Sequence, residues 1–257
     1  MTKIIAIANQ KGGVGKTTTS VNIAASLAAT KRRVLLIDLD PQGNATMGSG
    51  VDKMSLGHSA FEVLMGEKTI TEVLTQSVAG DYDLLPGNAD LTGAEVGLLD
   101  ELARETRLRN AVDEIKENYD FIFIDCPPSL NMLTVNALVA ASSVIIPMQC
   151  EYYALEGLSA LLESIEKIRK YLNPELKIEG LLRTMYDPRN NLATQVSAQL
   201  LKYFGEKVYR TIIPRNVRLA EAPSHGLPVI KYDKSSRGSL AYLALAGEML
   251  RRESVVA

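Results

Sequence analysis

The chain has 257 residues, of which 46% are hydrophobic and 23% are charged, and its formal net charge is −2. This composition is ordinary for a packed globular protein, which can build its core without disulfides or a structural metal. The two cysteines, Cys126 and Cys150, are too few for a disulfide framework, and no apolar run approaches the roughly 20 residues of a membrane-spanning helix. We therefore expect a cytoplasmic protein with a single domain over residues 1–257.

The charge is unevenly distributed along the chain. Residues 1–182 carry 16 Lys and Arg against 24 Asp and Glu, whereas residues 183–257 carry 12 against 6. A basic C-terminal quarter could form a surface that binds a polyanion. Composition alone favours the simpler interpretation, in which these are scattered, solvated charges.

Short, nearly continuous apolar runs alternate with segments of helical periodicity along the whole chain. Such runs are typical of parallel strands that are buried on both faces. We therefore predict an α/β fold, with a mostly parallel central sheet and helices on both of its faces. The predicted strands are 3–9, 33–39, 82–85, 121–125, 143–148, 178–182 and 208–213. The predicted helices are 17–29, 60–65, 71–75, 91–117, 131–141, 154–171, 192–204 and 238–252, and 42–57 is predicted to be a surface loop.

A glycine-rich segment, Lys11-Gly12-Gly13-Val14-Gly15-Lys16-Thr17-Thr18, directly follows the first predicted strand. It matches the phosphate-binding pattern G-x-x-x-x-G-K-[ST] in its strand–turn–helix context, except that Gln10 stands where the first glycine is expected. Glycines let the backbone curl so that successive N–H groups point at phosphate oxygens, and the following helix N-terminus favours the same anion. We expect Lys16 to reach the β- and γ-phosphates of ATP and the Thr17 hydroxyl to ligate Mg²⁺.

Three carboxylates lie at the ends of predicted strands. Asp125 ends the strand 121–125, where it could hold Mg²⁺ directly or through water. Asp38 and Asp40 lie two residues apart, so they share a face if their strand persists. We assign Asp38 to the Mg²⁺ shell and Asp40 to orienting the attacking water; the alternative is that both cap the turn at Pro41.

Lys11 is unusual within a phosphate loop. Because Lys16 already serves the phosphates of its own subunit, Lys11 could instead reach the nucleotide of a second subunit, acting in trans as an arginine finger does.

Together, these segments resemble the ATPases with a deviant Walker A loop, and among them the ParA/Soj chromosome-partitioning proteins. The resemblance rests on five segments and spans nearly the whole chain. They are Lys11–Thr18, Asp38-Leu39-Asp40-Pro41-Gln42-Gly43-Asn44, Asp125-Cys126-Pro127-Pro128, Ile213-Pro214-Arg215-Asn216-Val217-Arg218 and Glu221-Ala222-Pro223-Ser224-His225-Gly226.

The resemblance implies an ATP-dependent sandwich dimer with Mg²⁺, in which Lys11 crosses to the partner's phosphates and Asp40 positions the hydrolytic water. Thr17 would ligate the metal with support from Asp125, and a side chain at Gly12 would block dimerisation. The resemblance also places three residues near the adenine: Met185, Pro214 and Asn216.

The resemblance further implies that the ATP-bound dimer binds double-stranded DNA without sequence preference and so associates with the nucleoid. A centromere-binding partner of the ParB/Spo0J type would stimulate hydrolysis and release the dimer. In this context we favour a DNA-binding face in the basic C-terminal quarter, since such binding needs only Lys and Arg facing phosphates. Arg189 and Arg218 are the first candidates for DNA contacts, and four further cations are weaker ones, for which ordinary solvated charge remains the alternative: Lys202, Lys231, Lys234 and Arg237.

Other functions are weaker alternatives. A membrane-cycling ATPase of the MinD type shares the loop, but no amphipathic basic tail follows Leu240–Arg252. A metabolic kinase or ligase of the same fold would turn over without DNA or a partner protein. Cys126 and Cys150 lack the spacing of iron–sulfur ligands, and Tyr152-Tyr153 is predicted to pack at a strand-to-helix turn.

Overall fold

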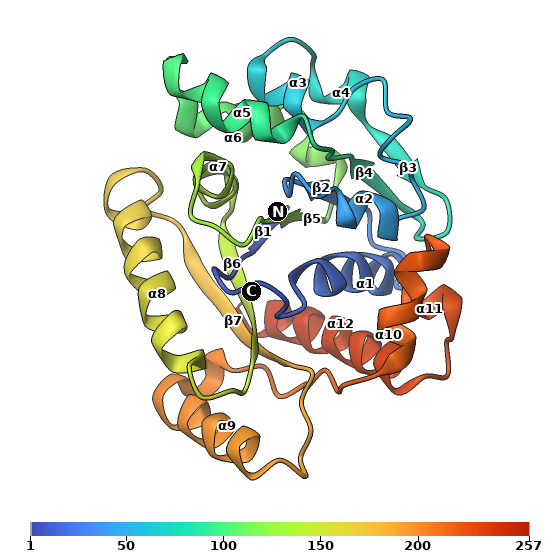
Figure 1. Cartoon of the computed structure of the whole chain (residues 1–257), viewed down its shortest axis with the longest axis vertical. Coiled ribbons are helices and arrows are strands. Elements are labelled where there is room, and N and C mark those ends of the chain that lie inside the picture. Colours follow the sequence, from blue (N-terminus) through green and yellow to red (C-terminus); the bar gives the residue numbers. More distant parts are fainter. Residues whose placement is uncertain (1, 257) are drawn as a thin grey trace.

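The computed structural model describes residues 2–256, with side chains through residue 253 (Figure 1). Its centre is a seven-stranded sheet in the order β3-β4-β2-β5-β1-β6-β7. Neighbouring strands run parallel except at the β3 edge, where β3 pairs antiparallel with β4. The strands are β1 (Lys3–Ile7), β2 (Val34–Asp38), β3 (Thr75–Ser77), β4 (Tyr82–Leu85), β5 (Phe121–Asp125), β6 (Ser143–Gln149) and β7 (Lys177–Thr184).

Helices cover both faces of this sheet (Figure 1), as the apolar strands predict. The α-helices are α1 (Lys16–Ala28), α2 (Asn44–Gly48), α3 (Ala60–Met65), α4 (Ile70–Val73), α5 (Leu91–Gly97), α6 (Arg107–Asp113), α7 (Met132–Ala140), α8 (Ala154–Tyr171), α9 (Asn191–Phe204), α10 (Val217–Glu221), α11 (Val229–Tyr232) and α12 (Arg237–Val256). Short 3-10 turns are η1 (Leu98–Asp100), η2 (Arg104–Thr106), η3 (Lys116–Asn118), η4 (Gly205–Lys207) and η5 (Ala222–His225).

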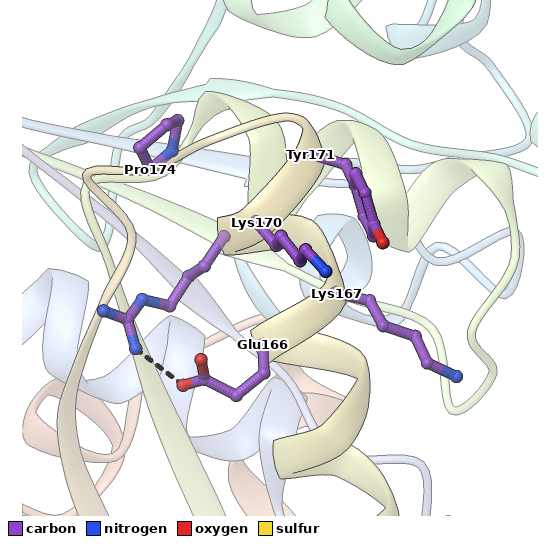
Figure 2. Close-up of a pocket in the computed structure, with 6 residues that line it drawn as sticks. Glu166, Lys167, Lys170, Tyr171 and Pro174 are labelled. Atoms are coloured by element: carbon purple, nitrogen blue, oxygen red, sulfur yellow. Dashed lines mark hydrogen bonds and ion pairs between the residues drawn. The ribbon is translucent and has the colours of Figure 1, made fainter.

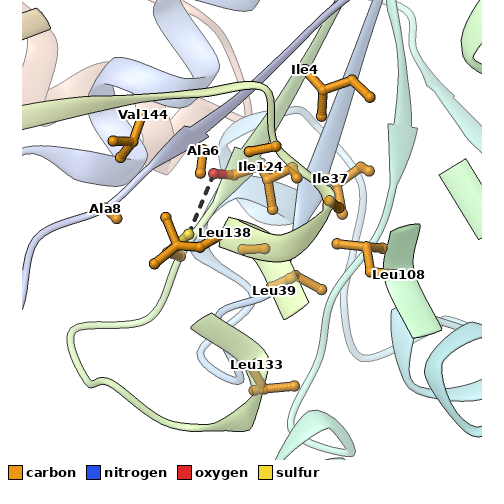
Figure 3. Close-up of a cluster of buried hydrophobic side chains, with 14 of the residues drawn as sticks. Ile4, Ala6, Ala8, Ile37, Leu39, Leu108, Ile124, Leu133, Leu138 and Val144 are labelled. Atoms are coloured by element: carbon orange, nitrogen blue, oxygen red, sulfur yellow. Dashed lines mark hydrogen bonds between the residues drawn. The ribbon is translucent and has the colours of Figure 1, made fainter. Parts of the chain in front are cut away.

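The alternation of side chains along β1 divides the core into two layers. Ile5 and Ile7 belong to the layer beneath α1 and α12, which includes Tyr242. Ile4 and Ala6 point to the opposite face, where Figure 3 shows them with side chains of β2, β5 and α7. Because all the strands except β3 are parallel, their carboxyl ends lie together at one edge of the sheet, and the site is located there.

Three sequence-based predictions need correction. The predicted loop 42–57 contains α2, and the predicted helix 91–117 is broken into α5, η1, η2 and α6. The predicted strand 208–213 was wrong, since it forms only an isolated bridge between Leu181 and Val208. The carboxylate of buried Glu248 accepts the N–H groups of Arg210 and Thr211 at 2.9 and 2.8 Å, so α12 satisfies donors that a neighbouring strand would otherwise bind.

Candidate nucleotide-binding site

The phosphate loop connects the end of β1 to the start of α1. Gly15 has φ +85°, a left-handed conformation that glycine adopts without steric cost, and it precedes the first residue of α1. The Thr184 hydroxyl, at the end of β7, donates a hydrogen bond to the carbonyl of Val14 at 2.7 Å. Asn9 donates its side-chain amide to the carbonyl of Pro147 at 2.8 Å. The loop is therefore tied to the ends of β6 and β7, two connections that no local sequence pattern predicts.

Lys16 is buried at the first position of α1, and its ammonium donates to the carbonyl of Lys11 at 3.4 Å. Burial lowers the pKa of Lys16, while the charges of Asp125 and Asp40 partly counteract that effect. A cation that contacts the curled backbone of the loop and lies within reach of two carboxylates is well placed to bind an anion there.

Asp125, at the end of β5, is held by two hydroxyls of α1. Thr17 Oγ1 donates to Asp125 Oδ2 at 2.8 Å, and Ser20 Oγ donates to Asp125 Oδ1 at 2.7 Å. Thr17 and Ser20 lie three residues apart and therefore on one face of the helix. Thr17 and Asp125 were predicted from the sequence to belong to one metal site, whereas Ser20 was not predicted to be part of it.

Asp38 and Asp40 differ in their contacts. Both oxygens of the fully buried Asp38 accept hydrogen bonds, Oδ2 from the N–H and hydroxyl of Thr46 and Oδ1 from the N–H of Asp40. The Thr46 hydroxyl in turn accepts the N–H of Gly87 at 2.9 Å. Asp38 thus anchors α2 to the sheet, whereas Asp40 Oδ1 accepts only the nearby N–H of Gln42 at 3.0 Å.

The three carboxylates concentrate negative charge at one edge of the sheet, where Asp38 and Asp125 are register partners on β2 and β5. Burial raises the pKa of Asp125, and the charge of Asp38 raises it further. Burial likewise raises the pKa of Asp38, against the hydrogen bonds from Thr46. A divalent cation would relieve this repulsion, and a hydroxyl beside a carboxylate is a donor set that suits Mg²⁺. Residues 2–256 contain no cluster of three or more His, Cys, Asp or Glu that could hold a metal ion.

Lys11 forms an ion pair within its own chain. Its ammonium lies 2.6 Å from Glu151 Oε2, and the two side chains are 42% and 50% exposed. The N–H of Lys11 also donates to Asn9 Oδ1 at 3.0 Å. Glu151 was not among the residues singled out from the sequence, because nothing in its local pattern relates it to the loop.

Of the residues expected to contact the adenine, Met185 lies beside the phosphate loop. Met185 has φ +47°, and a Cβ added to Gly15 would lie 3.9 Å from its Cε. Its neighbour Tyr186 forms an isolated bridge with Pro214, which brings the 214–216 segment to the same end of β7. Asn216 is the N-cap residue that directly precedes α10, and its Oδ1 is buried without a partner among the described residues.

The six cations expected to contact DNA are exposed but do not form one cluster. Four of them lie on or beside α10, α11 and the start of α12. Of the other two, one lies just before α9 and one within α9, which is a separate part of the molecule in Figure 1. Arg218 pairs with Glu221 at 2.8 Å and Asp233 at 3.3 Å, and Arg189 pairs with Asp187 at 2.7 Å. Arg218, Lys231, Lys234 and Arg237 form the first group, and Arg189 and Lys202 the second.

Tyr152 and Tyr153 lie at the strand-to-helix turn between β6 and α8, as predicted, but their rings are 73% and 68% exposed and contact each other edge to face instead of packing into the core. Cys126 and Cys150 are buried free thiols. Figure 2 shows a hollow lined by Lys167, Lys170 and Tyr171 at the C-terminal end of α8. That end of α8 leads into the start of β7 and so lies at the edge of the sheet opposite the phosphate loop. None of the helices within residues 2–256 has the length and the apolar character that a membrane span requires.

Comparisons with known proteins agree with this geometry. A family model described as an AAA domain matches residues 2–178. The Soj sporulation initiation inhibitor protein of Bacillus subtilis is 54% identical over 97% of this chain and 98% of its own length. The chromosome-partitioning protein ParA of Myxococcus xanthus is 51% identical over 98% of this chain and 89% of its own length.

Solved structures show the same fold. The cobyrinic acid a,c-diamide synthase of Mycobacterium smegmatis with bound ADP and magnesium has a TM-score of 0.88 and 38% identity, covering 100% of this chain and 97% of that one. The cell division ATPase MinD of Pyrococcus furiosus has a TM-score of 0.81 and 25% identity, covering 98% and 99%.

The sheet, the loop and these matches define a P-loop nucleotide-binding protein and confirm the predicted fold class. Within that class, the chain belongs to the Soj/ParA family of chromosome-partitioning ATPases.

Proposed function

We propose that this chain binds and hydrolyses ATP with Mg²⁺ at the loop between β1 and α1. The observation that carries the proposal is the contact of Thr17 with Asp125, beside the buried ammonium of Lys16. Lys16 neutralises charge on the β- and γ-phosphates, and Thr17 and Asp125 hold Mg²⁺, which supplies further positive charge there. The backbone N–H groups of Gly13, Gly15 and their neighbours orient the phosphates.

Asp40 orients the attacking water in this proposal. Asp38 contributes to the charge that surrounds the metal, although its oxygens already anchor Thr46, so we assign it an indirect role. Met185, Pro214 and Asn216 form the adenine side of the site, and the bridge from Tyr186 to Pro214 supports that placement.

ATP binding joins two copies of the chain in the proposed cycle, with Lys11 of each reaching the phosphates bound by the other. Lys11 is half-exposed at the loop and so is accessible to a second copy. Gly12 supports this orientation, because a Cβ added to it meets nothing within 4 Å in its own chain. The open space in front of Gly12 is where a second copy approaches.

The dimer binds double-stranded DNA without sequence preference through the cations of α9 to α12, and so associates with the nucleoid in the cytoplasm. Arg189 and Arg218 are paired with carboxylates, but exposed ion pairs are weak and can exchange for phosphate. Dimerisation doubles the number of phosphate contacts. A ParB/Spo0J-type protein then stimulates hydrolysis, which releases the DNA.

A gel-shift assay of the full chain with duplex DNA and Mg²⁺, carried out with ATP, with ADP and without nucleotide, tests the proposed cycle. We expect binding only with ATP, and a steep loss of affinity with added salt. The turnover of ATP should be slow and should rise when DNA and a ParB-type protein are both present. DNA binding that ignores the nucleotide would overturn the proposal.

A metabolic synthase is the second candidate, favoured by the 38% identity to the diamide synthase structure. The partitioning relatives are more similar, at 51% and 54% identity over nearly the whole chain. Fast ATP turnover with a small-molecule acid and a nitrogen donor, in the absence of DNA, would support the synthase instead.

A further inference from the structure

Helix α1 carries hydroxyl groups at four consecutive positions near its start, residues 17–20. Serine and threonine are weaker helix formers than alanine, because their hydroxyls compete for backbone hydrogen bonds. Ser20 is nevertheless 0% exposed, on a helix that packs against the sheet. A buried hydroxyl therefore occupies a position where alanine would favour the helix more, and its contacts show what it does there.

The Ser20 hydroxyl has two acceptors within reach. Its Oγ lies 2.7 Å from Asp125 Oδ1 and 3.1 Å from the carbonyl oxygen of Lys16, one turn earlier on α1. A hydroxyl has one proton to donate, and a carboxylate is a stronger acceptor than a carbonyl. The shorter contact is therefore the main one, and Ser20 directs its proton at Asp125.

Thr17 and Ser20 bind different oxygens of the same carboxylate. Thr17 Oγ1 donates to Asp125 Oδ2, and Ser20 Oγ donates to Asp125 Oδ1. The terminal torsion of an aspartate side chain has a broad energy minimum, so a single hydrogen bond leaves the plane of the carboxylate free to turn. Two donors, one on each oxygen and both from one face of a helix, fix that plane.

The two hydroxyls differ in what else they can contact. Thr17 is only partly buried, in the first turn of α1 beside the phosphate loop, so its oxygen can also ligate a metal. Ser20 lies about one turn further along the helix and is completely buried. Ser20 can therefore act on a metal only through Asp125.

We propose that Ser20 is a positioning residue of the Mg²⁺ site, which holds the Asp125 carboxylate in the orientation that binds the metal. This inference rests on the proposed binding of ATP with Mg²⁺ and adds a residue that controls the affinity for the metal. Removing a group that orients a metal-binding side chain typically costs about 10–100-fold in metal affinity or activity. Without the Ser20 hydroxyl, Asp125 keeps only the hydrogen bond from Thr17, and its carboxylate can turn away from the metal.

Calorimetric titration of the full chain with ADP, once with Mg²⁺ and once with EDTA, separates the affinity for the metal from the affinity for the nucleotide. The test variants are Ser20→Ala, which removes the donor, and Ser20→Thr, which keeps it. Ser20→Cys keeps a side chain of similar size but donates only weakly, so it tests the proposal even if the alanine variant is unstable. Ser26→Ala is the matched control, since Ser26 is also buried on α1, at 1% exposure. Thermal melting shows that each variant is folded.

We expect Ser20→Ala and Ser20→Cys to weaken ADP binding about tenfold with Mg²⁺ and less than about twofold with EDTA. In a hydrolysis assay, the Mg²⁺ concentration that gives the half-maximal rate should rise about tenfold, while the rate at saturating Mg²⁺ should fall less than about threefold. Ser20→Thr and Ser26→Ala should match the unsubstituted chain.

Equal losses with Mg²⁺ and with EDTA, or an equal effect of Ser26→Ala, would show that Ser20 only packs α1 and would overturn the proposal. Full Mg²⁺ dependence in Ser20→Ala would overturn this inference alone and leave the proposed Mg²⁺ site intact. If the unsubstituted chain binds ADP equally well with Mg²⁺ and with EDTA, the proposed Mg²⁺ site fails, and this inference with it.

Discussion

The hydroxyl of Thr17 donates a hydrogen bond to Asp125 across 2.8 Å, and 108 residues separate the two in the chain. The contact joins the first turn of α1 to the end of β5. It fixes the direction of the hydroxyl proton, which leaves the oxygen lone pairs of Thr17 available to a cation. A local helix and a distant strand thus build one half of a metal site.

We expect Thr17→Ala to lower the rate of ATP hydrolysis on the order of 10²-fold, because the site loses a Mg²⁺ ligand and one of the two hydroxyls that hold Asp125. Thr17→Ser keeps the hydroxyl and should stay within about threefold of the unsubstituted rate. Phosphate release at saturating ATP and Mg²⁺ measures both. Equal loss in the two variants would show that packing of the threonine methyl, and not the hydroxyl, matters.

Asp125→Asn should stabilise the nucleotide-free chain at alkaline pH while abolishing turnover. Burial raises the pKa of Asp125, and the charge of Asp38 adds to this. A carboxyl with a raised pKa binds its proton more tightly in the folded chain, so stability is lost as the pH rises from the unfolded value toward the folded one. The advantage of the variant should therefore grow between about pH 4, the unfolded pKa, and about pH 7, the folded pKa, and then stay constant; we expect it to amount to on the order of 1–3 kcal/mol, as followed by urea unfolding. A difference independent of pH would contradict this.

Thr184→Val should weaken ATP binding through the backbone of the phosphate loop. The substitution keeps the shape of the side chain but removes the hydrogen bond to the Val14 carbonyl. A buried acceptor left without its donor costs about 1–3 kcal/mol, and we expect a five- to tenfold rise in the dissociation constant. Fluorescence titration with a labelled ATP analogue measures it, and Thr184→Ser should restore the affinity.

Arg218→Ala should reduce DNA affinity and make it less sensitive to salt. Each of the two copies in the dimer loses one cation that faces a phosphate, so the slope of log affinity against log salt should change by about 2. Arg169→Ala is a matched control, since Arg169 also pairs with a glutamate three residues away on an exposed helix. If the two variants lose the same DNA affinity, the loss reflects the net charge of the protein, and α10 does not contact DNA.

Gly12→Val should leave the monomer folded and able to bind ATP but unable to dimerise. Within its own chain a Cβ at Gly12 meets nothing within 4 Å, so the fold should tolerate the side chain. Gel filtration with light scattering, in the presence of Mg²⁺ and a non-hydrolysable analogue, should show only monomer. Gly57→Val is the control, because a Cβ there also meets nothing within 4 Å. A Gly12→Val dimer of normal stability would argue against a second copy in front of the loop.

The fold class and the core of the site could be predicted from the sequence because their signals are local. Apolar runs such as Phe121–Asp125 define buried strands, and the spacing of glycines before Lys16 defines the phosphate loop. Parallel strands end at one edge, which already places Asp38 and Asp125 together. The family resemblance extended these predictions to a lysine with a partner in trans and to a DNA-binding surface, and both stay predictions.

Contacts between distant segments decided the rest. Residues 208–213 have the composition of a strand, but the carboxylate of Glu248 takes two of their N–H groups, so no strand forms. Tyr152 and Tyr153 are aromatic residues that we expected to pack at the strand-to-helix turn, but the structure leaves their side chains exposed.

The phosphate loop shows the same division. Its residues alone determine that the backbone curls, and that Lys16 and Thr17 begin a helix at its end. Only the tertiary structure decided that Thr184 supports the loop, that Ser20 holds Asp125 and that Lys11 pairs with Glu151, because those partners lie up to 170 residues apart in the chain. A local sequence pattern does not predict which distant side chains will lie within hydrogen-bonding distance once the chain has folded.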